Sequence, residues 1–285
     1  MSFNGRTLAS QANNVGSIPI TRSKPPKEVH DKPQVKPFIY ETLTTKSLFF
    51  STRDVQSKMH TERPYELQFE YTKIMMGFLQ FIPLPRTIAM IGLGGGSLAK
   101  FCYRYLPDAQ ITVIEINPDV LALREDFAIP ADDQRFTVQL ADAADFVRDT
   151  DQKFDILLAD GFDEEGLPER LSSQEFYDHC HDILTPGGVM VSNLHKCSTL
   201  FDVYLDRLQS SFSDPLLQVN DPSASNCLTF ACREGEAPRK ALTGMRRPPE
   251  LDPMAWTELI PSMGRVFLAS RELARNGDPR LLQKA

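Results

Sequence analysis

The sequence predicts an α/β fold whose doubly wound, mostly parallel sheet has seven strands and an antiparallel last strand. Short apolar runs and helical segments alternate five times between residues 87 and 212. The runs are almost continuously apolar, which is typical of parallel strands that helices bury on both faces. The alternation then stops, and two strand-like segments follow with only turn-forming residues between them. No helix fits between these two segments, so they are expected to pair antiparallel.

The expected elements follow from hydrophobic period and from helix start and stop residues. The strands of the sheet are expected at residues 87–91, 111–116, 136–140, 154–159, 189–191, 216–219 and 227–232. Helices are expected at residues 97–106, from Asn117–Pro118 onward, and at 143–148, 173–184, 199–212 and 253–276. Asn117 suits an N-cap and Pro118 the first helical position. Upstream, alternating aromatic and β-branched residues predict a β-hairpin at 38–52, and apolar spacing predicts a helix at 65–81.

Four regions follow from these elements. Residues 1–37 are rich in proline and basic residues and poor in large apolar ones, so we expect a flexible basic tail. Residues 38–85 form a small N-terminal β/helix region, residues 86–233 carry the large sheet, and residues 234–285 form a connection and helices.

Composition excludes several classes of protein. The net charge is −7 and the pI is about 5.3, which argues against a protein that mainly grips nucleic acid. No run of about 18 apolar residues is present, so no membrane-spanning helix is expected. The five cysteines are scattered and show no metal-ligand spacing. This pattern predicts reduced thiols in a cytoplasmic protein without a bound metal.

A glycine-rich loop follows the first strand of the sheet and opens a helix. It reads Gly92-Leu93-Gly94-Gly95-Gly96. Glycines at this place let a ligand approach the backbone, and the helix N-terminus favours polar or anionic groups. The third glycine of the dinucleotide fingerprint would fall at Ser97, which argues against a nicotinamide dehydrogenase. The loop therefore predicts a nucleotide or nucleoside site, and a simple tight turn is the alternative.

Acidic residues end the next three strands of the expected sheet. Glu115 can accept both hydroxyls of a ribose, Asp142 can meet an adenine amino group, and Asp160 ends the fourth strand. Helix capping or turn formation is the alternative for each of them alone. Because the carboxyl ends of parallel strands meet at one edge, together they favour a nucleoside site. Its expected residues are Gly92, Gly94, Gly95, Gly96, Glu115, Ile116, Asp142 and Ala143.

The order of these motifs resembles the class I S-adenosylmethionine-dependent transferases, which have a Rossmann-like fold. It is more closely similar to the spermidine synthase (polyamine aminopropyltransferase) family over residues 38–233. The stretch Asp160-Gly161-Phe162-Asp163 resembles the Asp-Ser-x-Asp-Pro loop of that family. Residues 184–189 match the run into its fifth strand, and residues 55–57 resemble a segment whose glutamine contacts the nucleoside. Tyr71 lies near the place of the Tyr-His-Glu motif.

The resemblance implies a transferase of polyamine biosynthesis, with S-adenosylmethionine or its decarboxylated form as the donor and a small amine as the acceptor. It implies that Asp160 is the base, that Asp163 holds the ammonium group of the acceptor, and that Tyr71 orients Asp160. It also implies that Gln56 contacts the nucleoside and that the chain forms a homodimer.

Two departures from the family pattern keep alternatives open. Gly95 stands where the family has an aspartate that binds the amine of the decarboxylated donor. Its loss also removes repulsion against the carboxylate of intact S-adenosylmethionine, so a methyltransferase with an unknown acceptor is one alternative. An inactive nucleoside-binding homologue is another. Phe162 is expected to narrow the acceptor pocket, and His195, after the fifth strand, is a candidate acceptor contact.

Overall fold

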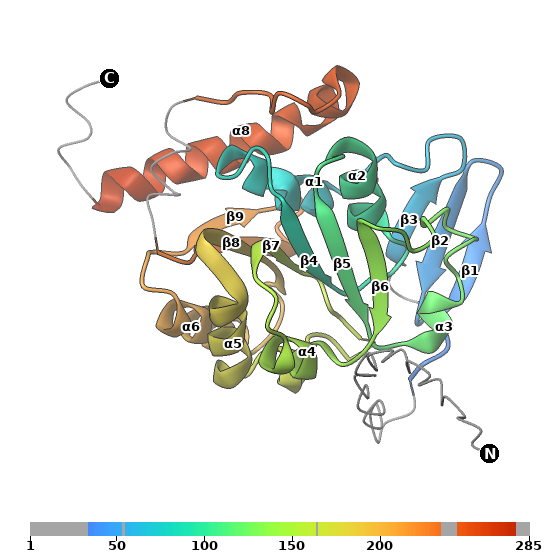
Figure 1. Ribbon diagram of the computed structural model, residues 1–285, viewed down its shortest axis with the longest axis horizontal. Helices are drawn as coiled ribbons and strands as arrows, with labels where there is room; N and C mark the ends of the chain where they lie inside the picture. Colours follow the sequence, from blue (N-terminus) through green and yellow to red (C-terminus); the bar gives the residue numbers. More distant parts are fainter. Residues whose placement is uncertain (1–33, 53–54, 164, 235–243, 278–285) are drawn as a thin grey trace, which may run out of the picture.

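The computed structural model describes residues 34–52, 55–163, 165–234 and 244–277. Residues 1–33 of the predicted tail lie outside the described residues. A seven-stranded sheet forms the centre, with helices on both faces (Figure 1). Its strands in spatial order are β6 (Phe136–Leu140), β5 (Gln110–Glu115), β4 (Thr87–Ile91), β7 (Phe154–Ala159), β8 (Leu184–His195), β10 (Asn226–Cys232) and β9 (Leu217–Asn220). The first five are parallel and β10 runs antiparallel to β8 and β9, which confirms the predicted fold class.

The helices form one layer on each face of this sheet. One layer contains α1 (Glu70–Met75), the 3-10 helix η1 (Met76–Gln80), α2 (Ser97–Tyr105) and α8 (Pro253–Gly277). The other contains α4 (Ala143–Asp149), α5 (Gln174–Ile183) and α6 (Phe201–Ser211). The short helices α3 (Pro118–Leu121) and η2 (Glu169–Leu171) lie in loops after the strands. Figure 1 shows α1, α2 and α8 above the sheet and α4, α5 and α6 below it.

The side chains of the central strand β4 alternate between two buried cores, one on each face of the sheet. Ile88 and Met90 of β4 join the core under α1, α2 and α8, whereas Ala89 and Ile91 join the core under α4, α5 and α6. Successive side chains of a strand point to opposite faces, so both faces of a parallel strand must be apolar. The first core also includes Leu48 from the N-terminal region and Met263 from α8. The regions before and after the large sheet therefore pack against it.

The N-terminal region is a three-stranded antiparallel sheet and not only a hairpin. The predicted hairpin is present as β1 (Phe38–Glu41) and β2 (Thr45–Phe49), and β3 (Val55–His60) adds to it. The sequence pattern of β3 is weak because only Ser57 and Met59 of its six residues are buried. Its remaining side chains are polar or exposed, so no apolar alternation marks it.

The helix predicted at residues 65–81 is shorter than expected. It begins at Glu70 and tightens into the 3-10 helix η1 from Met76 onward. Gly77 explains the tight packing there, because a Cβ at this position would lie 2.7 Å from Val266 of α8 and 2.9 Å from Phe230 of β10. The apolar spacing correctly predicted which face of this segment is buried. It did not predict where the regular helix begins and ends.

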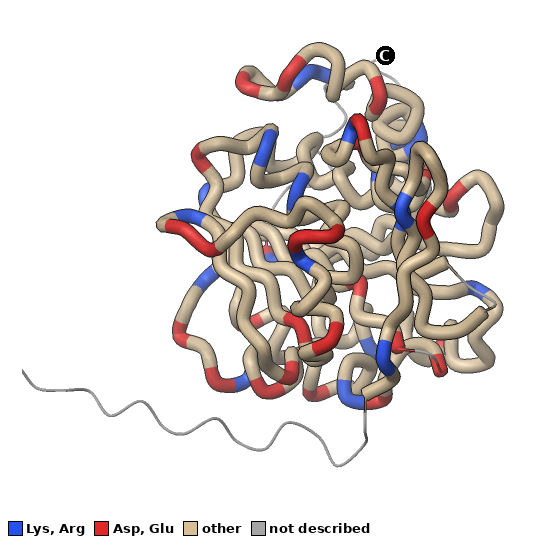
Figure 2. Tube along the Cα trace, turned by 90° about the vertical axis from the view of Figure 1, so that its right-hand side faces the viewer, with Lys and Arg blue, Asp and Glu red and all other residues tan. Residues whose placement is uncertain are grey.

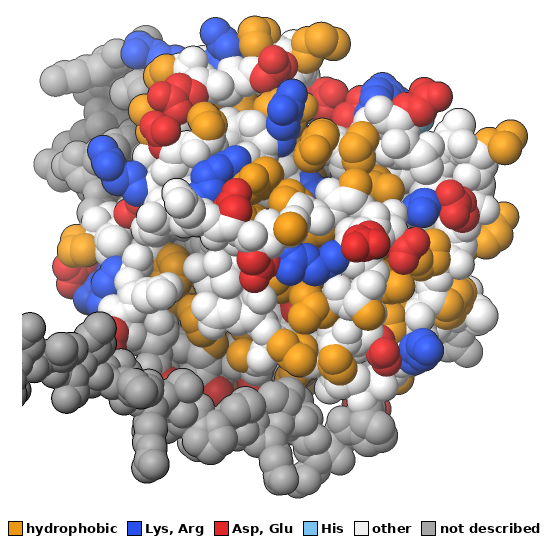
Figure 3. Space-filling model, turned by 45° about the vertical axis from the view of Figure 1, so that its right-hand side comes forward, with side chains coloured by type: hydrophobic (Ala, Val, Ile, Leu, Met, Phe, Trp, Pro, Cys, Tyr) orange, Lys and Arg blue, Asp and Glu red, His pale blue; other side chains and the backbone are white. Residues whose placement is uncertain are grey.

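Charges of both signs are mixed over the described surface. Figure 2 shows Lys and Arg interspersed with Asp and Glu along the trace, and the face in Figure 3 has no extended basic patch. Within the described residues, no helix is long and apolar enough to cross a membrane.

Candidate active site

The glycine loop and Asp160 lie side by side where the strand order of the sheet reverses. The loop follows β4 and Asp160 follows β7, and these strands are neighbours. The backbone N–H of Asp160 donates to the carbonyl of Ile91 at 3.0 Å. Gly92 has φ +90°, and a Cβ there would lie 2.5 Å from the carbonyl oxygen of Asp160. Only glycine permits this approach, and open α/β sheets bind ligands at such a switch point.

Asp160 is held by two hydrogen-bond donors from different elements. The Tyr71 hydroxyl, from α1, donates to Oδ2 at 3.1 Å, and the Asn193 amide, from β8, donates to Oδ1 at 2.8 Å. Burial raises the pKa of Asp160, while these two donors and nearby His195 lower it again. Burial also raises the pKa of Tyr71, with a further contribution from Asp160, so Tyr71 stays a neutral donor. The predicted contact between Tyr71 and Asp160 is present.

Asn193 was missed by sequence reasoning. It is 3% exposed and lies near the end of β8, after an apolar run that ends at Val191. A buried amide in such a strand needs hydrogen-bond partners. The amide residue within an apolar strand was therefore the signal that could have identified Asn193. The partner itself, Asp160, is visible only once β7 and β8 are paired.

Glu115 holds the glycine loop in place. One carboxylate oxygen accepts from the N–H of Leu93 at 2.9 Å, and the other accepts from the N–H of Asn117 at 2.8 Å. Burial raises the pKa of Glu115, whereas the backbone N–H groups of Asn117 and Leu93 lower it. A carboxylate has about four lone-pair sites, so it can also accept ribose hydroxyls. Glu115 is therefore a loop anchor whose role as a ribose contact stays a prediction.

The N-terminal sheet reaches the glycine loop through β3. The hydroxyls of Ser57 and Ser97 lie 3.3 Å apart. A Cβ at Gly95 would lie 2.6 Å from the Ser57 hydroxyl and 2.9 Å from the Phe127 ring, so neighbouring side chains fill that space. Gln56, beside Ser57, is half-buried on β3. The structure thus brings the predicted glutamine segment to the predicted loop.

Lys100 anchors the turn that covers the glycine loop. Its side chain is 1% exposed, and its Nζ donates to the carbonyl of Phe127 at 2.7 Å. A Cβ at Gly96 would lie 2.5 Å from Ile129, which follows Phe127 in the same turn. Burial lowers the pKa of Lys100 from its ordinary value of 10.5 to about 8.

Lys100→Met is expected to raise the free energy of unfolding at pH 7 by about 2 kcal/mol, because a buried charge is removed. With a lowered pKa, wild-type stability rises with pH between about 8 and 10.5, where the unfolded chain binds the proton and the folded chain does not. The advantage of the variant should therefore shrink across that range in thermal unfolding. Lys153→Met is the control, since its Nζ also donates to a carbonyl, at 2.9 Å, but is exposed. Equal pH dependence of the stability of both variants would contradict the lowered pKa of Lys100.

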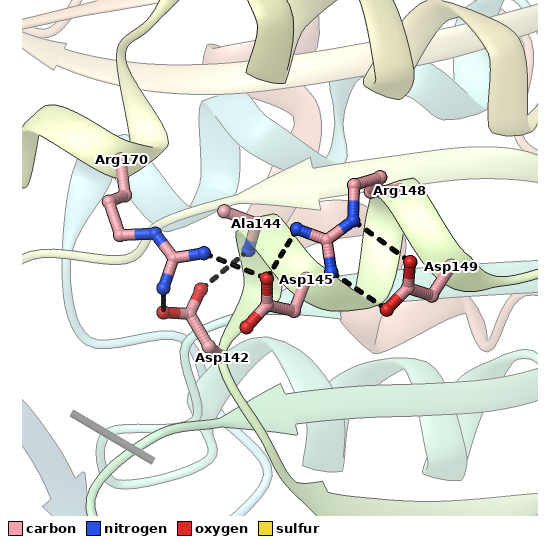
Figure 4. A network of polar contacts seen from close by, with 6 residues as sticks. All are labelled: Asp142, Ala144, Asp145, Arg148, Asp149 and Arg170. Carbon is pink, nitrogen blue, oxygen red and sulfur yellow. Dashed lines mark hydrogen bonds and ion pairs between the residues drawn. The ribbon is translucent and has the colours of Figure 1, made fainter. Parts of the chain in front are cut away.

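Asp142 caps α4 and pairs with an arginine from the segment that carries Asp160 (Figure 4). One carboxylate oxygen accepts from the N–H of Ala144 at 2.8 Å, and the other accepts from Arg170 at 2.5 Å. Arg170 also donates to Asp145 at 2.8 Å. We call residues 160–163 and 165–171 the active-site segment. Arg170 thereby ties this segment to the end of β6, where Asp142 is predicted to meet adenine and Ala143 to belong to the nucleoside site.

Arg170→Met is expected to lower the free energy of unfolding by about 1–2 kcal/mol and to speed proteolysis within the active-site segment. The reason is that Asp142 is 6% exposed and would face Asp145 without the guanidinium. Arg148→Met is the control, since Arg148 pairs with Asp145 and Asp149 without touching the segment. Chemical denaturation and limited proteolysis should separate the two variants, and equal effects would contradict this role.

The active-site segment also places Asp163 and Phe162. Asp163 accepts from the N–H groups of Glu165 and Gly166 at 2.8 and 2.9 Å, so its carboxylate shapes its own turn. Phe162 stacks on His195 of β8, with ring centroids 4.0 Å apart and an interplanar angle of 10°. An aromatic pair therefore lies beside Asp160.

Ile116, a predicted residue of the nucleoside site, is half-buried and follows Glu115 directly.

The geometry defines a class of protein. A glycine loop, an acidic residue at the end of the neighbouring strand and a held carboxylate at the switch point are typical of α/β enzymes that bind a nucleoside. Residues 68–225, more than half of the chain, match the family described as "Spermine/spermidine synthase domain". The chain belongs to the spermine/spermidine synthase family, and the predicted class, a transferase, is confirmed.

Two bacterial relatives named polyamine aminopropyltransferase are similar over most of their length. The protein of Neisseria meningitidis is 34% identical over 195 residues, which is 68% of this chain and 74% of the relative. The protein of Chromobacterium violaceum is 33% identical over 207 residues, or 72% of this chain and 78% of the relative.

Solved structures share the fold. A probable spermidine synthase from Corynebacterium glutamicum has a TM-score of 0.62 at 18% identity, covering 80% of this chain and 91% of that one. A spermidine synthase in complex with the transition state analogue AdoDATO has a TM-score of 0.54 at 19% identity, covering 83% of this chain and 87% of that one. Human methyltransferase-like protein 13 in complex with SAH has a TM-score of 0.54 at 22% identity, covering 70% of this chain and 92% of that one.

Proposed function

We propose that this protein transfers an aminopropyl group from decarboxylated S-adenosylmethionine to a small amine. The observation that carries the proposal is Asp160, a carboxylate held by Tyr71 and Asn193 next to the glycine loop. A base in this position serves an amine nucleophile. The two bacterial relatives that bear the name polyamine aminopropyltransferase support the same reaction.

The reaction is a displacement at the sulfonium carbon of the donor. The amine nitrogen forms a bond to the carbon of the aminopropyl group while the carbon–sulfur bond breaks. The electron pair of that bond returns to sulfur, which leaves as a thioether nucleoside. Asp160 accepts the proton of the amine, and its raised pKa fits this role. Because the sulfonium leaving group is already activated, positioning of the two reactants supplies much of the rate.

On this proposal the nucleoside lies along the ends of β4, β5 and β6. Glu115 and Ile116 contact the ribose, Asp142 and Ala143 contact the adenine, and Gln56 contacts the nucleoside from β3. The amine lies on the other side of Asp160, against the stacked rings of Phe162 and His195. Asp163 attracts the distal ammonium group of the amine.

Methyl transfer from intact S-adenosylmethionine is the second candidate. Gly95 favours it, because no carboxylate stands there to bind the amine of a decarboxylated donor or to repel a donor carboxylate. The neutral Ser57 hydroxyl lies at that place, 3.3 Å from the Ser97 hydroxyl. The likeness in fold to human methyltransferase-like protein 13 is compatible with this candidate.

Calorimetric titration with the two donors, followed by mass spectrometry of reactions with putrescine and spermidine, tests the proposal. Tighter binding of the decarboxylated donor and an aminopropylated amine are expected. Tighter binding of the intact donor together with a methylated product would establish the second candidate. Binding of the thioether nucleoside without turnover of either donor would identify an inactive homologue.

Other expectations stay predictions. These are a cytoplasmic location, a homodimer, no contact with nucleic acid, and no bound metal. In the part of the chain that the structure describes, no three His, Cys, Asp or Glu side chains are placed to hold a metal ion.

A further inference from the structure

The first described residues of the chain lie beside the proposed ribose site. We call residues 34–37 the entry segment, because they lead into β1. The side-chain Nδ2 of Asn117 donates to the carbonyl of Val35 at 2.9 Å. Asn117 follows Glu115, the last residue of β5, by two positions. In Figure 1 the entry segment, in blue, passes α3 on its way to β1. One hydrogen bond thus joins residues 82 positions apart at the carboxyl end of β5.

Asn117 makes hydrogen bonds in three directions. Its backbone N–H donates to Glu115 at 2.8 Å. Its side-chain oxygen accepts from the N–H of Asp119 at 2.9 Å and so caps α3. Its Nδ2 donates to Val35. Asn117 is 3% exposed, so loss of the Val35 carbonyl would leave a buried donor unpaired. The contact with Val35 is therefore needed to satisfy this amide.

These bonds form a continuous path from the entry segment to the glycine loop. Glu115 accepts from Asn117 through one carboxylate oxygen and from the N–H of Leu93 through the other, at 2.9 Å. Glu115 and Asn117 are both buried, and Val35 is half-buried. In a buried network each hydrogen bond restricts the orientation of the next group. The position of the entry segment thereby influences the carboxylate that is proposed to contact the ribose.

The N-terminal region approaches the same site at two further places. The Ser57 hydroxyl of β3 lies 3.3 Å from that of Ser97, at the glycine loop. Nζ of Lys46, from β2, lies 3.7 Å from the carboxylate of Asp126, in the turn that covers this loop. The three-stranded sheet and the entry segment, which are continuous in the chain, therefore contact both the glycine loop and the end of β5.

We propose that the entry segment forms a wall of the nucleoside site on its ribose side, and that Asn117 is the positioning residue that holds this wall in place. Docking of the segment and binding of a nucleoside then support each other, because both depend on the orientation of Glu115. Such coupling is reciprocal, so a bound nucleoside stabilises the docked segment by the same factor. The ligand class rests on the proposed function, whereas the path from the segment through Asn117 to the glycine loop does not.

Asn117→Ser tests the positioning role, because it removes the hydrogen bond to Val35. Serine caps helices as well as asparagine does, and the backbone N–H that donates to Glu115 remains. In calorimetric titration we expect the thioether nucleoside to bind about three- to tenfold more weakly. KM for the donor should rise by a similar factor while kcat is unchanged, since Asp160 is untouched. Asn117→Asp is a second variant that keeps the size and the cap and turns an acceptor toward the Val35 carbonyl, so its nucleoside affinity should also fall.

Hydrogen exchange of the full chain measures the coupling itself. In the wild type the nucleoside should slow exchange of the backbone amides of Val35, Lys36 and Phe38, and Asn117→Ser should lose this protection. Without any ligand, the amide of Leu93 should exchange faster in Asn117→Ser than in the wild type, because its acceptor Glu115 is held less firmly.

Gln80→Met is the matched control. Nε2 of Gln80 donates to the carbonyl of Met263 at 2.7 Å, so this amide also joins two distant segments, η1 and α8, which carry no residue of the proposed site. The control should leave nucleoside affinity and the exchange of Leu93 unchanged. Values in Asn117→Ser that equal those of the control and the wild type would overturn the proposal. A wild type that binds no nucleoside would instead overturn the proposed function, and the exchange of Leu93 without ligand would still decide the role of Asn117.

Discussion

Asp160→Asn is expected to reduce group transfer by about 10³-fold or more while nucleoside affinity stays within a few-fold. The variant keeps the size of the side chain and can still hydrogen-bond to Tyr71 and Asn193, which hold Asp160 in the wild type. It lacks only the capacity to accept the proton of an amine. Steady-state kinetics with an amine acceptor and calorimetry with the thioether nucleoside measure the two quantities separately.

The same substitution is expected to stabilise the protein at pH 7. Burial raises the pKa of Asp160 above its ordinary value of 3.8, so the folded chain holds this proton more tightly than the unfolded chain. The stability that this group contributes is therefore full below the ordinary pKa and is lost as pH rises through the raised pKa. Asn does not ionise and avoids that loss, so Tm at pH 7 should rise. Below pH 4 the two proteins should converge.

Asp182→Asn is the control for Asp160→Asn, because Asp182 is an exposed carboxylate of α5. It should leave kcat and Tm unchanged. Transfer that survives in Asp160→Asn would show that another group accepts the proton. A lower Tm in that variant would show that the charge of Asp160 is compensated in the folded protein.

Glu115→Ala is expected to weaken nucleoside binding about 30- to 100-fold. Two causes act together, since the proposed charge-assisted contacts to the ribose hydroxyls are lost, and the N–H groups of Leu93 and Asn117 lose their acceptor. Calorimetric titration with the thioether nucleoside measures the affinity, and thermal unfolding reports the loss of support for the glycine loop.

A 2′-deoxy nucleoside separates these two causes. Wild type should bind the deoxy ligand about tenfold more weakly than the ribose ligand, because one hydroxyl contact to a buried carboxylate is missing. Glu115→Ala should bind both ligands with equal affinity if Glu115 contacts the ribose. A variant that still discriminates between the ligands would restrict Glu115 to its role as an anchor of the glycine loop.

Most of the sheet could be predicted because its signals are local. The strands at β6 and β7 have the bounds that the apolar runs indicate, and Asn117 caps α3 as its residue type suggests. β8 was less accessible, since it begins at Leu184 and passes through a Pro-Gly-Gly turn signal before the apolar run. That strand is stabilised by pairing with β7 and β10. Such pairing between distant residues cannot be predicted from the local sequence of the strand.

The amino-acid sequence by itself was sufficient for the α/β class, for the glycine loop, and for acidic residues at the ends of successive strands. These depend on residue type and on the period of burial along the chain. The partners of those acidic residues depended on the tertiary structure. Asn193 meets Asp160 only because β7 and β8 are neighbours, and Arg170 meets Asp142 only because the active-site segment folds back over α4. Hydrogen bonds and ion pairs act over a few ångströms, so distant residues become partners only when folding brings them together.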